Sequence, residues 1–201
     1  MVQQLFLILN WFGICVFAVS GALVASRKEM DIVGFAMLGT VTGIGGGTIR
    51  DVLLGNLPVF WVKEPAYLVT CVAVSVITFF VAHIPQSRER VLLWFDAIGL
   101  ALFSVTSTAS ALAFGAGAPV AIAMGVATAT FGGIIRDILG GESPIILKQE
   151  VYITAALLGA AMFVGLIGIH FTRDGAAILA FLSAFALRAA ALHWNLSLPL
   201  Y

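Results

Sequence analysis

The sequence predicts an all-α membrane protein in which seven transmembrane helices form two inverted three-helix repeats followed by a seventh helix. The first observation behind this prediction is composition: 61% of the 201 residues are hydrophobic and only 10% are charged. An average soluble domain has about 25% charged residues, and a water-soluble core of this length could not cover so much apolar surface. The other two observations are the spacing of the apolar segments and an internal repeat.

Seven segments of the chain are apolar and about as long as the roughly 20 residues that a membrane-spanning helix needs. They comprise residues 5–24, 32–49, 66–84, 91–114, 119–135, 151–170 and 176–193. Most charged residues fall between these segments, and the weakest boundary is the uncharged connection of residues 115–119. Since the chain has no long linker or low-complexity tract, residues 1–201 are expected to form a single membrane domain.

An internal repeat relates the first three spans to the next three. Gly-Gly-Gly-Thr-Ile-Arg-Asp at residues 45–51 returns 86 positions later as Phe-Gly-Gly-Ile-Ile-Arg-Asp, and nine of the twenty residues in 45–64 are identical in 131–150. At the same offset, Asn10 aligns with Asp96. Such similarity indicates duplication. Because each unit, about 5–84 and about 91–170, holds three helices, the second must be inverted relative to the first.

The distribution of basic residues predicts the orientation, since short cytoplasmic loops are enriched in Lys and Arg. Lys63 and Arg173 fall on one side of the seven spans. A larger group falls on the other side, namely Arg27, Lys28, Arg88, Arg90 and Lys148. We therefore expect the N-terminus outside the cell and the C-terminus in the cytoplasm.

Glycines interrupt the second and fifth spans at corresponding positions, which is the best sequence indication of a transport site. Each glycine destabilises a helix by about 1 kcal/mol relative to Ala. We therefore expect both helices to be kinked or broken there, with freed carbonyl oxygens that suit a cation. The alternative is that the glycines only allow helices to pack closely. The residues concerned are Gly43, Gly45, Gly46, Gly47, Gly132 and Gly133.

Three residues beside these glycines belong to the same candidate site. Thr42 and Thr128 align across the repeats, and a pore could use their hydroxyls. Phe131 stands where the first copy has Gly45. The second kink is therefore expected to be tighter, or the Phe131 ring to plug the pore.

Charged residues in or beside the spans are candidates for structural or gating roles, because charge is costly in a bilayer. The motif supplies Arg50-Asp51 and Arg136-Asp137. These residues either end a helix at the interface, with Arg extended toward the headgroups, or pair inside the bundle. Since neighbouring residues do not face each other on a regular helix, buried pairs are expected to find partners in the opposite repeat.

Two further charged residues leave alternatives open. Asp96, near the start of the fourth span, either caps its helix or binds an ion. Arg188, in the last span, either extends to the interface or forms a charged gate or a subunit contact.

Other function classes are not indicated by the sequence. The net charge is zero, so no overall field attracts nucleic acid. The glycine run does not fit the dinucleotide-binding fingerprint, and the sequence shows no catalytic triad arrangement and no metal-ligand spacing. We expect no enzyme activity, no cofactor and no fixed metal site, apart from transient K+ or Na+ at the kink carbonyls.

The doubled motif, with Gly55 and Pro58 following the first copy and Gly141 and Pro144 following the second, resembles the prokaryotic trimeric intracellular cation (TRIC) channel family. That family overlaps a bacterial membrane family described as glycine transporters. The resemblance covers nearly the whole chain. It implies a homotrimer in the prokaryotic inner membrane, with a pore in each protomer bounded by kinked second and fifth helices. Monovalent cations, chiefly potassium but also sodium, would be the substrate.

Two functions therefore stand as hypotheses. The first is a monovalent cation channel whose ions pass the carbonyls and hydroxyls of the two glycine-broken helices, with membrane lipids as surroundings. The alternative is a secondary transporter for a small amino acid such as glycine. Its carboxylate would bind at a positive half-helix N-terminus and its amine at free carbonyls.

Overall fold

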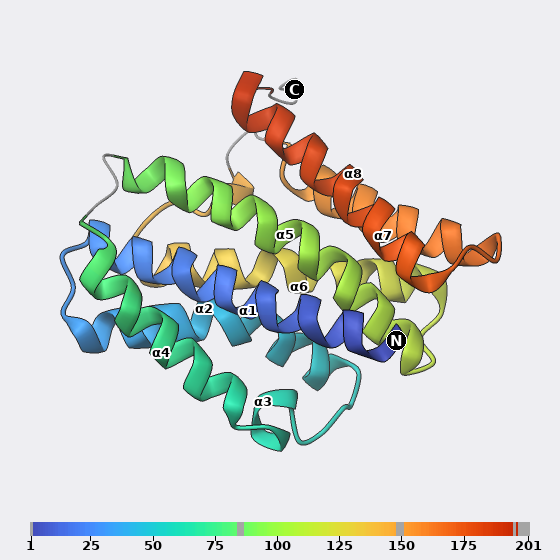
Figure 1. Ribbon diagram of the computed structural model, residues 1–201, viewed down its shortest axis with the longest axis horizontal. Helices are drawn as coiled ribbons and strands as arrows, with labels where there is room; N and C mark the ends of the chain where they lie inside the picture. Colours follow the sequence, from blue (N-terminus) through green and yellow to red (C-terminus); the bar gives the residue numbers. More distant parts are fainter. Residues whose placement is uncertain (1, 84–86, 148–150, 195, 197–201) are drawn as a thin grey trace.

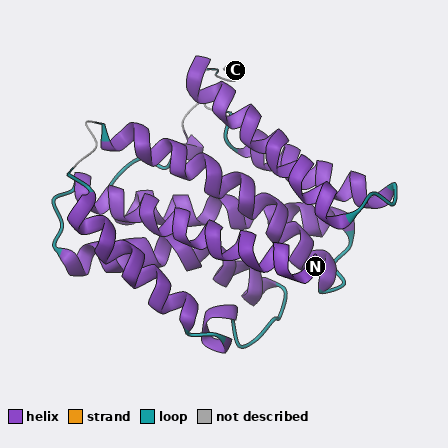
Figure 2. Ribbon diagram, viewed as in Figure 1, coloured by secondary structure: helices purple, strands orange, loops and turns teal. Residues whose placement is uncertain are grey.

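The structure is a computed structural model that describes residues 2–83, 87–147, 151–194 and 196. Within these residues all regular structure is helical (Figure 2). The elements are α1 (Val2–Arg27), α2 (Ile32–Leu53), α3 (Phe60–Lys63), α4 (Ala66–Val81), α5 (Arg88–Ala113), α6 (Ala118–Leu139), the short 3-10 turn η1 (Ile145–Leu147), α7 (Ile153–Gly168) and α8 (Arg173–Trp194).

Each of the seven predicted spans is helical over most of its length, but the helices differ in how far they could extend across a membrane. Five of them, α1, α2, α5, α6 and α8, are long and apolar enough to cross a membrane. The other two, α4 and α7, have 16 residues each, or about 24 Å at 1.5 Å per residue. Because a hydrocarbon core is about 30 Å thick, helix length alone supports five spans, and a seven-span topology stays a prediction.

Helix α5 lies at the centre of the bundle, in contact with α1, α6, α7 and α8, while α2 packs against α1, α4 and α6. Helices α1 and α2 run in opposite directions, as do α5 and α6, and α1 and α5 are also antiparallel (Figure 1). Phe17 of α1 and Phe103 of α5 meet with ring centroids 5.1 Å apart. The Phe103 ring lies over Gly13 and the Phe17 ring lies over Gly99, so the two helices cross through reciprocal contacts.

The same turn ends α2 and α6. Gly55 and Gly141 have positive φ angles of 69° and 65°, the left-handed conformation that favours glycine after a helix. The next residue donates its N–H back into the helix, from Asn56 to the Asp51 carbonyl and from Glu142 to the Asp137 carbonyl, both at 2.8 Å. These turns place the loop after each helix beside its Arg-Asp pair.

Candidate functional site

Helices α2 and α6 cross with their backbones in contact. A Cβ atom on Gly46 would lie within 3.0 Å of the Thr128 carbonyl oxygen, and a Cβ on Gly132 would lie 2.7 Å from the Thr42 carbonyl oxygen. Real Cβ atoms essentially never approach another atom so closely. The two contacts are related by the 86-residue offset. Glycine is therefore required here by the neighbouring backbone.

Neither helix breaks at its glycines. The α-helix is continuous from Ile32 to Leu53 in α2 and from Ala118 to Leu139 in α6, so the expectation of a break with freed carbonyl oxygens is wrong. The physical reason is that the helices gain close contacts with their neighbours, which offset the low helix propensity of glycine. A Cβ would meet Cys71 at Gly43, Ile135 at Gly45, Phe60 at Gly47 and Tyr152 at Gly133. A bend at these positions stays a prediction.

The two threonines of the candidate site are bonded within their own helices. Thr42 Oγ1 donates to the Leu38 carbonyl at 2.6 Å and Thr128 Oγ1 donates to the Met124 carbonyl at 2.7 Å. Such back-bonding is the usual state of a helical Thr and leaves the oxygen lone pairs for another partner. Phe131 is half-buried on α6, and its suggested role as a plug stays a prediction.

Arg136 is fully buried between two carboxylates. Its Nε donates to Asp137 Oδ1 at 2.8 Å, and its Nη1 donates to Asp96 Oδ1 and to Ser20 Oγ, both at 2.7 Å. Ser20 lies on α1 and Asp96 on α5, so this guanidinium joins three helices. Arg136 Nη2 and Asp96 Oδ2 have no hydrogen-bond partner among the described residues.

Arg50 makes a looser set of contacts at the other end of the crossing. Its Nε and Nη2 donate to Asp51 Oδ1 at 2.9 and 2.7 Å, and its Nη1 donates to Ser107 Oγ of α5 at 3.2 Å. Arg50 is 8% exposed, whereas Arg136 is 0% exposed. Only one carboxylate contacts this guanidinium within the described residues.

Each Asp of the motif uses its second oxygen to fix the following loop. Asp51 Oδ2 accepts the Phe60 N–H at the start of α3, and Asp137 Oδ2 accepts the Ile145 N–H at the start of η1, both at 2.9 Å. The Arg-Asp pair is thus a joint between the helix and the loop that leaves it.

The expected location and pairing of these charges need correction. The interfacial alternative is wrong for both Arg50 and Arg136, because both are buried. The expectation that adjacent Arg and Asp cannot pair is also wrong, since the long Arg side chain folds back onto the next residue. The cross-repeat partners exist as serines: Ser107 for Arg50 and Ser20 for Arg136.

Asp96 and Arg188 also lie inside the bundle. Asp96 does not cap α5, because it lies more than two turns after the first residue of that helix, Arg88. Arg188 is 0% exposed and its Cζ lies 5.1 Å from the Tyr152 ring centroid, so its extension to the membrane interface is wrong. A gating or subunit role for Arg188 stays a prediction.

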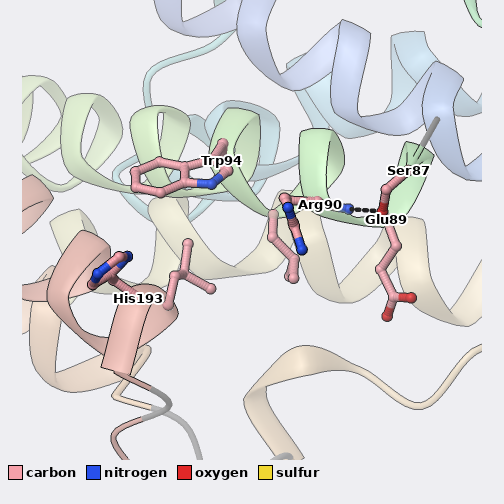
Figure 3. A pocket seen from close by; sticks show the side chains of 7 residues that line it. Ser87, Glu89, Arg90, Trp94 and His193 are labelled. Atoms are coloured by element: carbon pink, nitrogen blue, oxygen red, sulfur yellow. Dashed lines mark hydrogen bonds between the residues drawn. The ribbon is translucent and has the colours of Figure 1, made fainter. Parts of the chain in front are cut away.

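Some cavities among the described residues adjoin charged side chains. One, of about 220 Å³, adjoins Arg50 and is lined by Phe6, Leu7, Asn10, Arg50, Thr106 and Ser110. A larger one, of about 670 Å³, lies between the start of α5 and the end of α8 (Figure 3). Its walls include the exposed side chains of Glu89 and Arg90, together with Trp94 and His193, and it is remote in sequence from the repeated motif.

Sequence reasoning missed several residues of this arrangement. Ser107, Ser110 and Tyr152 were not candidates, and Ser20 was one polar residue among many in the spans. A signal was available for Ser110 and Thr106, because α5 carries a run of hydroxyl residues at 104, 106, 107, 108 and 110. Since a lone Ser or Thr in a span usually bonds to its own helix, that run does not by itself identify a site.

The comparisons with known proteins agree with this architecture. The model of a family described as "Glycine transporter" matches residues 7–83 and 93–167, two segments whose starts are 86 residues apart (93 − 7). The UPF0126 membrane protein of Vibrio cholerae is 40% identical over 98% of this chain and 83% of its own length. The UPF0126 inner membrane protein YadS of Escherichia coli is 38% identical over 96% of this chain and 94% of its own.

Solved structures of channels are also similar. The TRIC trimeric intracellular cation channel orthologue from Rhodobacter sphaeroides is 64% identical, with a TM-score of 0.95 over 96% of this chain and 100% of the other. A prokaryotic TRIC channel crystallised in 0.5 M KCl is 32% identical, with a TM-score of 0.90 over 98% of this chain and 100% of the other. The chain is therefore a membrane protein that belongs to the prokaryotic TRIC cation channel family, which overlaps the family described as glycine transporters.

Proposed function

We propose that the protein is a channel for monovalent cations, K+ and also Na+, with one pore in each protomer of a homotrimer. The observation that carries the proposal is the 64% identity and TM-score of 0.95 to a TRIC trimeric intracellular cation channel orthologue. Within the protomer, the pore would open where α2 and α6 cross. The backbone contacts at Gly46 and Gly132 leave no passage between the helices at that point, so this arrangement corresponds to a closed channel.

The crossing is suited to opening because little side-chain interlocking holds it. Gly46 and Gly132 each face a carbonyl oxygen across the interface, and small residues of this kind let the backbones of membrane helices approach closely without interlocking side chains. The ends of the two helices are held by Arg50 and Arg136. We infer that the helices separate between these two joints, and that the cavity at Arg50 is one entrance.

The topology that this proposal needs has seven membrane crossings, with the N-terminus outside and the C-terminus in the cytoplasm. The short helices α4 and α7 can cross if the bilayer thins locally or flanking residues extend to the interface. Of the basic residues behind the orientation, Lys148 lies outside the described residues. Labelling of a single Cys introduced at partly exposed Asn56, in a variant without Cys15 and Cys71, by an impermeant thiol reagent should occur from outside intact cells.

Currents through the purified protein test the function. In a planar bilayer under a KCl gradient, we expect discrete unitary currents that reverse near the potassium equilibrium potential. Gly165→Ala is a suitable control for the effects of mutating, purifying and reconstituting the protein, because a Cβ at Gly165 would meet nothing within 4 Å. Saturable glycine uptake into proteoliposomes without unitary currents would contradict the channel.

Transport of glycine is the second candidate, favoured by the description of the matching family. The cavity at Arg50 offers a guanidinium, an amide and two hydroxyls, groups that bind carboxylates. A radiolabelled glycine uptake assay on the same proteoliposomes separates the two candidates, because a channel conducts K+ in the absence of any amino acid.

A further inference from the structure

The two halves of the protein give their corresponding arginines different partners. In the second half, Asp96 Oδ1 contacts Arg136 Nη1 at 2.7 Å. In the first half the corresponding position, 86 residues earlier, is Asn10. The Asn10 amide is neutral and donates to the Tyr67 hydroxyl at 3.5 Å. Arg50 therefore lacks the second carboxylate that its counterpart has.

Arg50 contacts a cavity instead of a second carboxylate. Asn10 and Arg50 both line the 220 Å³ cavity, together with the hydroxyl residues Thr106 and Ser110 of α5. At the 86-residue offset, Phe6 corresponds to Leu92 and Ser110 corresponds to Val24, which are 3% and 0% exposed. The counterparts of these two lining residues are therefore buried apolar side chains, whereas the Arg50 end has a cavity with polar groups in its wall.

Arg50 retains hydrogen-bonding capacity toward this cavity. A guanidinium has five N–H donors, and the bonds of Arg50 to Asp51 and Ser107 use three of them within the described residues. Asp51 approaches the edge formed by Nε and Nη2, while its other oxygen accepts the Phe60 N–H. Among the residues that the structure describes, the only hydrogen bond at Nη1 is the long 3.2 Å contact with Ser107.

We propose that this cavity binds a small monovalent anion, a halide or a small carboxylate, which occupies the place at Arg50 that the Asp96 carboxylate has at Arg136. Charge-assisted bonds from a guanidinium to an anion are among the strongest hydrogen bonds in proteins, and the second N–H of the Asn10 amide can donate as well. The proposal rests on the proposed function in one respect: a bound anion offsets the charge of Arg50 at the entrance and makes cation entry easier.

Thermal unfolding of the purified protein tests the site without relying on transport. Unfolding is followed in potassium lactobionate, whose disaccharide anion is too large for the cavity, and then with KCl or potassium formate added at constant ionic strength. A ligand that binds only the folded state raises the Tm in a saturable way. We expect such a rise for the wild type with at least one of the two small anions. Stabilisation by formate alone would identify a carboxylate as the ligand, and stabilisation by both a general anion site.

Two variants make the test specific. Asn10→Asp supplies a tethered carboxylate, so its Tm should no longer respond to small anions. Asp96→Asn removes the second-half carboxylate at a fully buried position, so its Tm should fall and the second half should gain no new response to chloride. A wild-type Tm that is the same in lactobionate, chloride and formate, or an Asn10→Asp protein that keeps the wild-type response, would overturn the proposal.

Current measurements connect the site to conduction. With lactobionate replaced by chloride on the side of the Arg50 cavity, the wild-type K+ conductance should rise, and that of Asn10→Asp should be the same in both salts. Absence of K+ current in every variant would refute the channel function, while the unfolding experiments would still decide the anion site.

Discussion

The Arg50 and Arg136 ends of the α2–α6 crossing have the same local sequence but different surroundings. Both guanidiniums bind the following Asp, and both reach a Ser on the other repeat. Arg136 has a second carboxylate and is 0% exposed, whereas Arg50 has one and is 8% exposed beside a cavity. The comparison shows that the Arg-Asp motif itself connects each helix to the loop that follows it. Residues outside the motif decide whether the guanidinium is fully buried or contacts a cavity.

Acidic residues of the second half are replaced by asparagines in the first. Asn10 corresponds to Asp96, and Asn56 corresponds to Glu142. Glu142 forms ion pairs with Arg27 at 3.2 Å and with Lys28 at 3.6 Å. The Arg136 end is therefore held by several ion pairs, and the Arg50 end by neutral groups around one pair. This difference fits the proposed channel, in which the Arg136 end would be a stable anchor and the Arg50 end an entrance.

The largest effect on this comparison is expected from removing the buried guanidinium. Arg136→Ala leaves Asp96 and Asp137 buried near each other without their shared cation, which costs about 3–5 kcal/mol for a buried ion pair. Arg50→Ala should cost less, because Asp51 has no second carboxylate beside it and the site already contacts the cavity. Unfolding in detergent, followed by Trp fluorescence, measures both. Equal losses for the two variants would contradict the difference between the ends.

The sequence predicted the helices well because their apolar segments are long and separated by charges. It ended the second and fifth spans at 49 and 135, before the Arg-Asp pairs, whereas α2 and α6 continue to Leu53 and Leu139. The reason is that ion pairing and contacts with other helices allow these charges to be buried. The short helix α3 was not predicted, since its start depends on the tertiary bond from the Phe60 N–H to Asp51.

The site was less predictable than the helices. The glycine positions were identified, but their role depends on which atoms lie across the interface, and a single chain does not reveal that the partner of Gly46 is the Thr128 carbonyl. The pairing of Arg with the adjacent Asp was missed because the rule about helix neighbours concerns Cβ directions, and a long side chain is not bound by it. The serine partners carry no sequence signal of their own.

The next largest effect is expected at the crossing, which both ends share. Gly46→Ala places a methyl group against the Thr128 backbone, which cannot move as a side chain can, and overpacking of this kind costs about 1–3 kcal/mol. The matched control, Gly165→Ala, lies in helix α7 with open space at the Cβ position, and it should gain up to about 1 kcal/mol. If Gly46→Ala were as stable as the control in the same unfolding assay, the backbone contact would not hold the crossing closed.

A smaller stability effect but a clear change in current is expected from closing the Arg50 end. Ser110→Val introduces the residue type of its counterpart, Val24, into the wall of the cavity. The Ser110 hydroxyl bonds only to its own helix at the Thr106 carbonyl within the described residues, so stability should change by less than about 1 kcal/mol. K+ conductance should fall about tenfold, which corresponds to about 1.4 kcal/mol of added barrier.

Ser183→Val is the matched control for this experiment. Ser183 makes the same kind of bond, to the Leu179 carbonyl at 2.8 Å, but it lies on α8 and does not line the Arg50 cavity. Its variant should conduct as the wild type does. Equal conductance of Ser110→Val and Ser183→Val would show that ions do not enter beside Arg50.

The smallest effect is expected at the surface ion pairs of the Arg136 end. Glu142→Gln removes the contacts with Arg27 and Lys28, whose side chains are 29% and 36% exposed, and exposed pairs contribute about 0–1 kcal/mol. The loss should shrink at high salt, because exposed charges are screened, and the denaturation midpoint in 0.05 M and 1 M KCl measures this. A salt-independent loss of stability as large as that of Arg136→Ala would contradict this ranking. It would show that the surface ion pairs, and not the buried carboxylates, stabilise the Arg136 end.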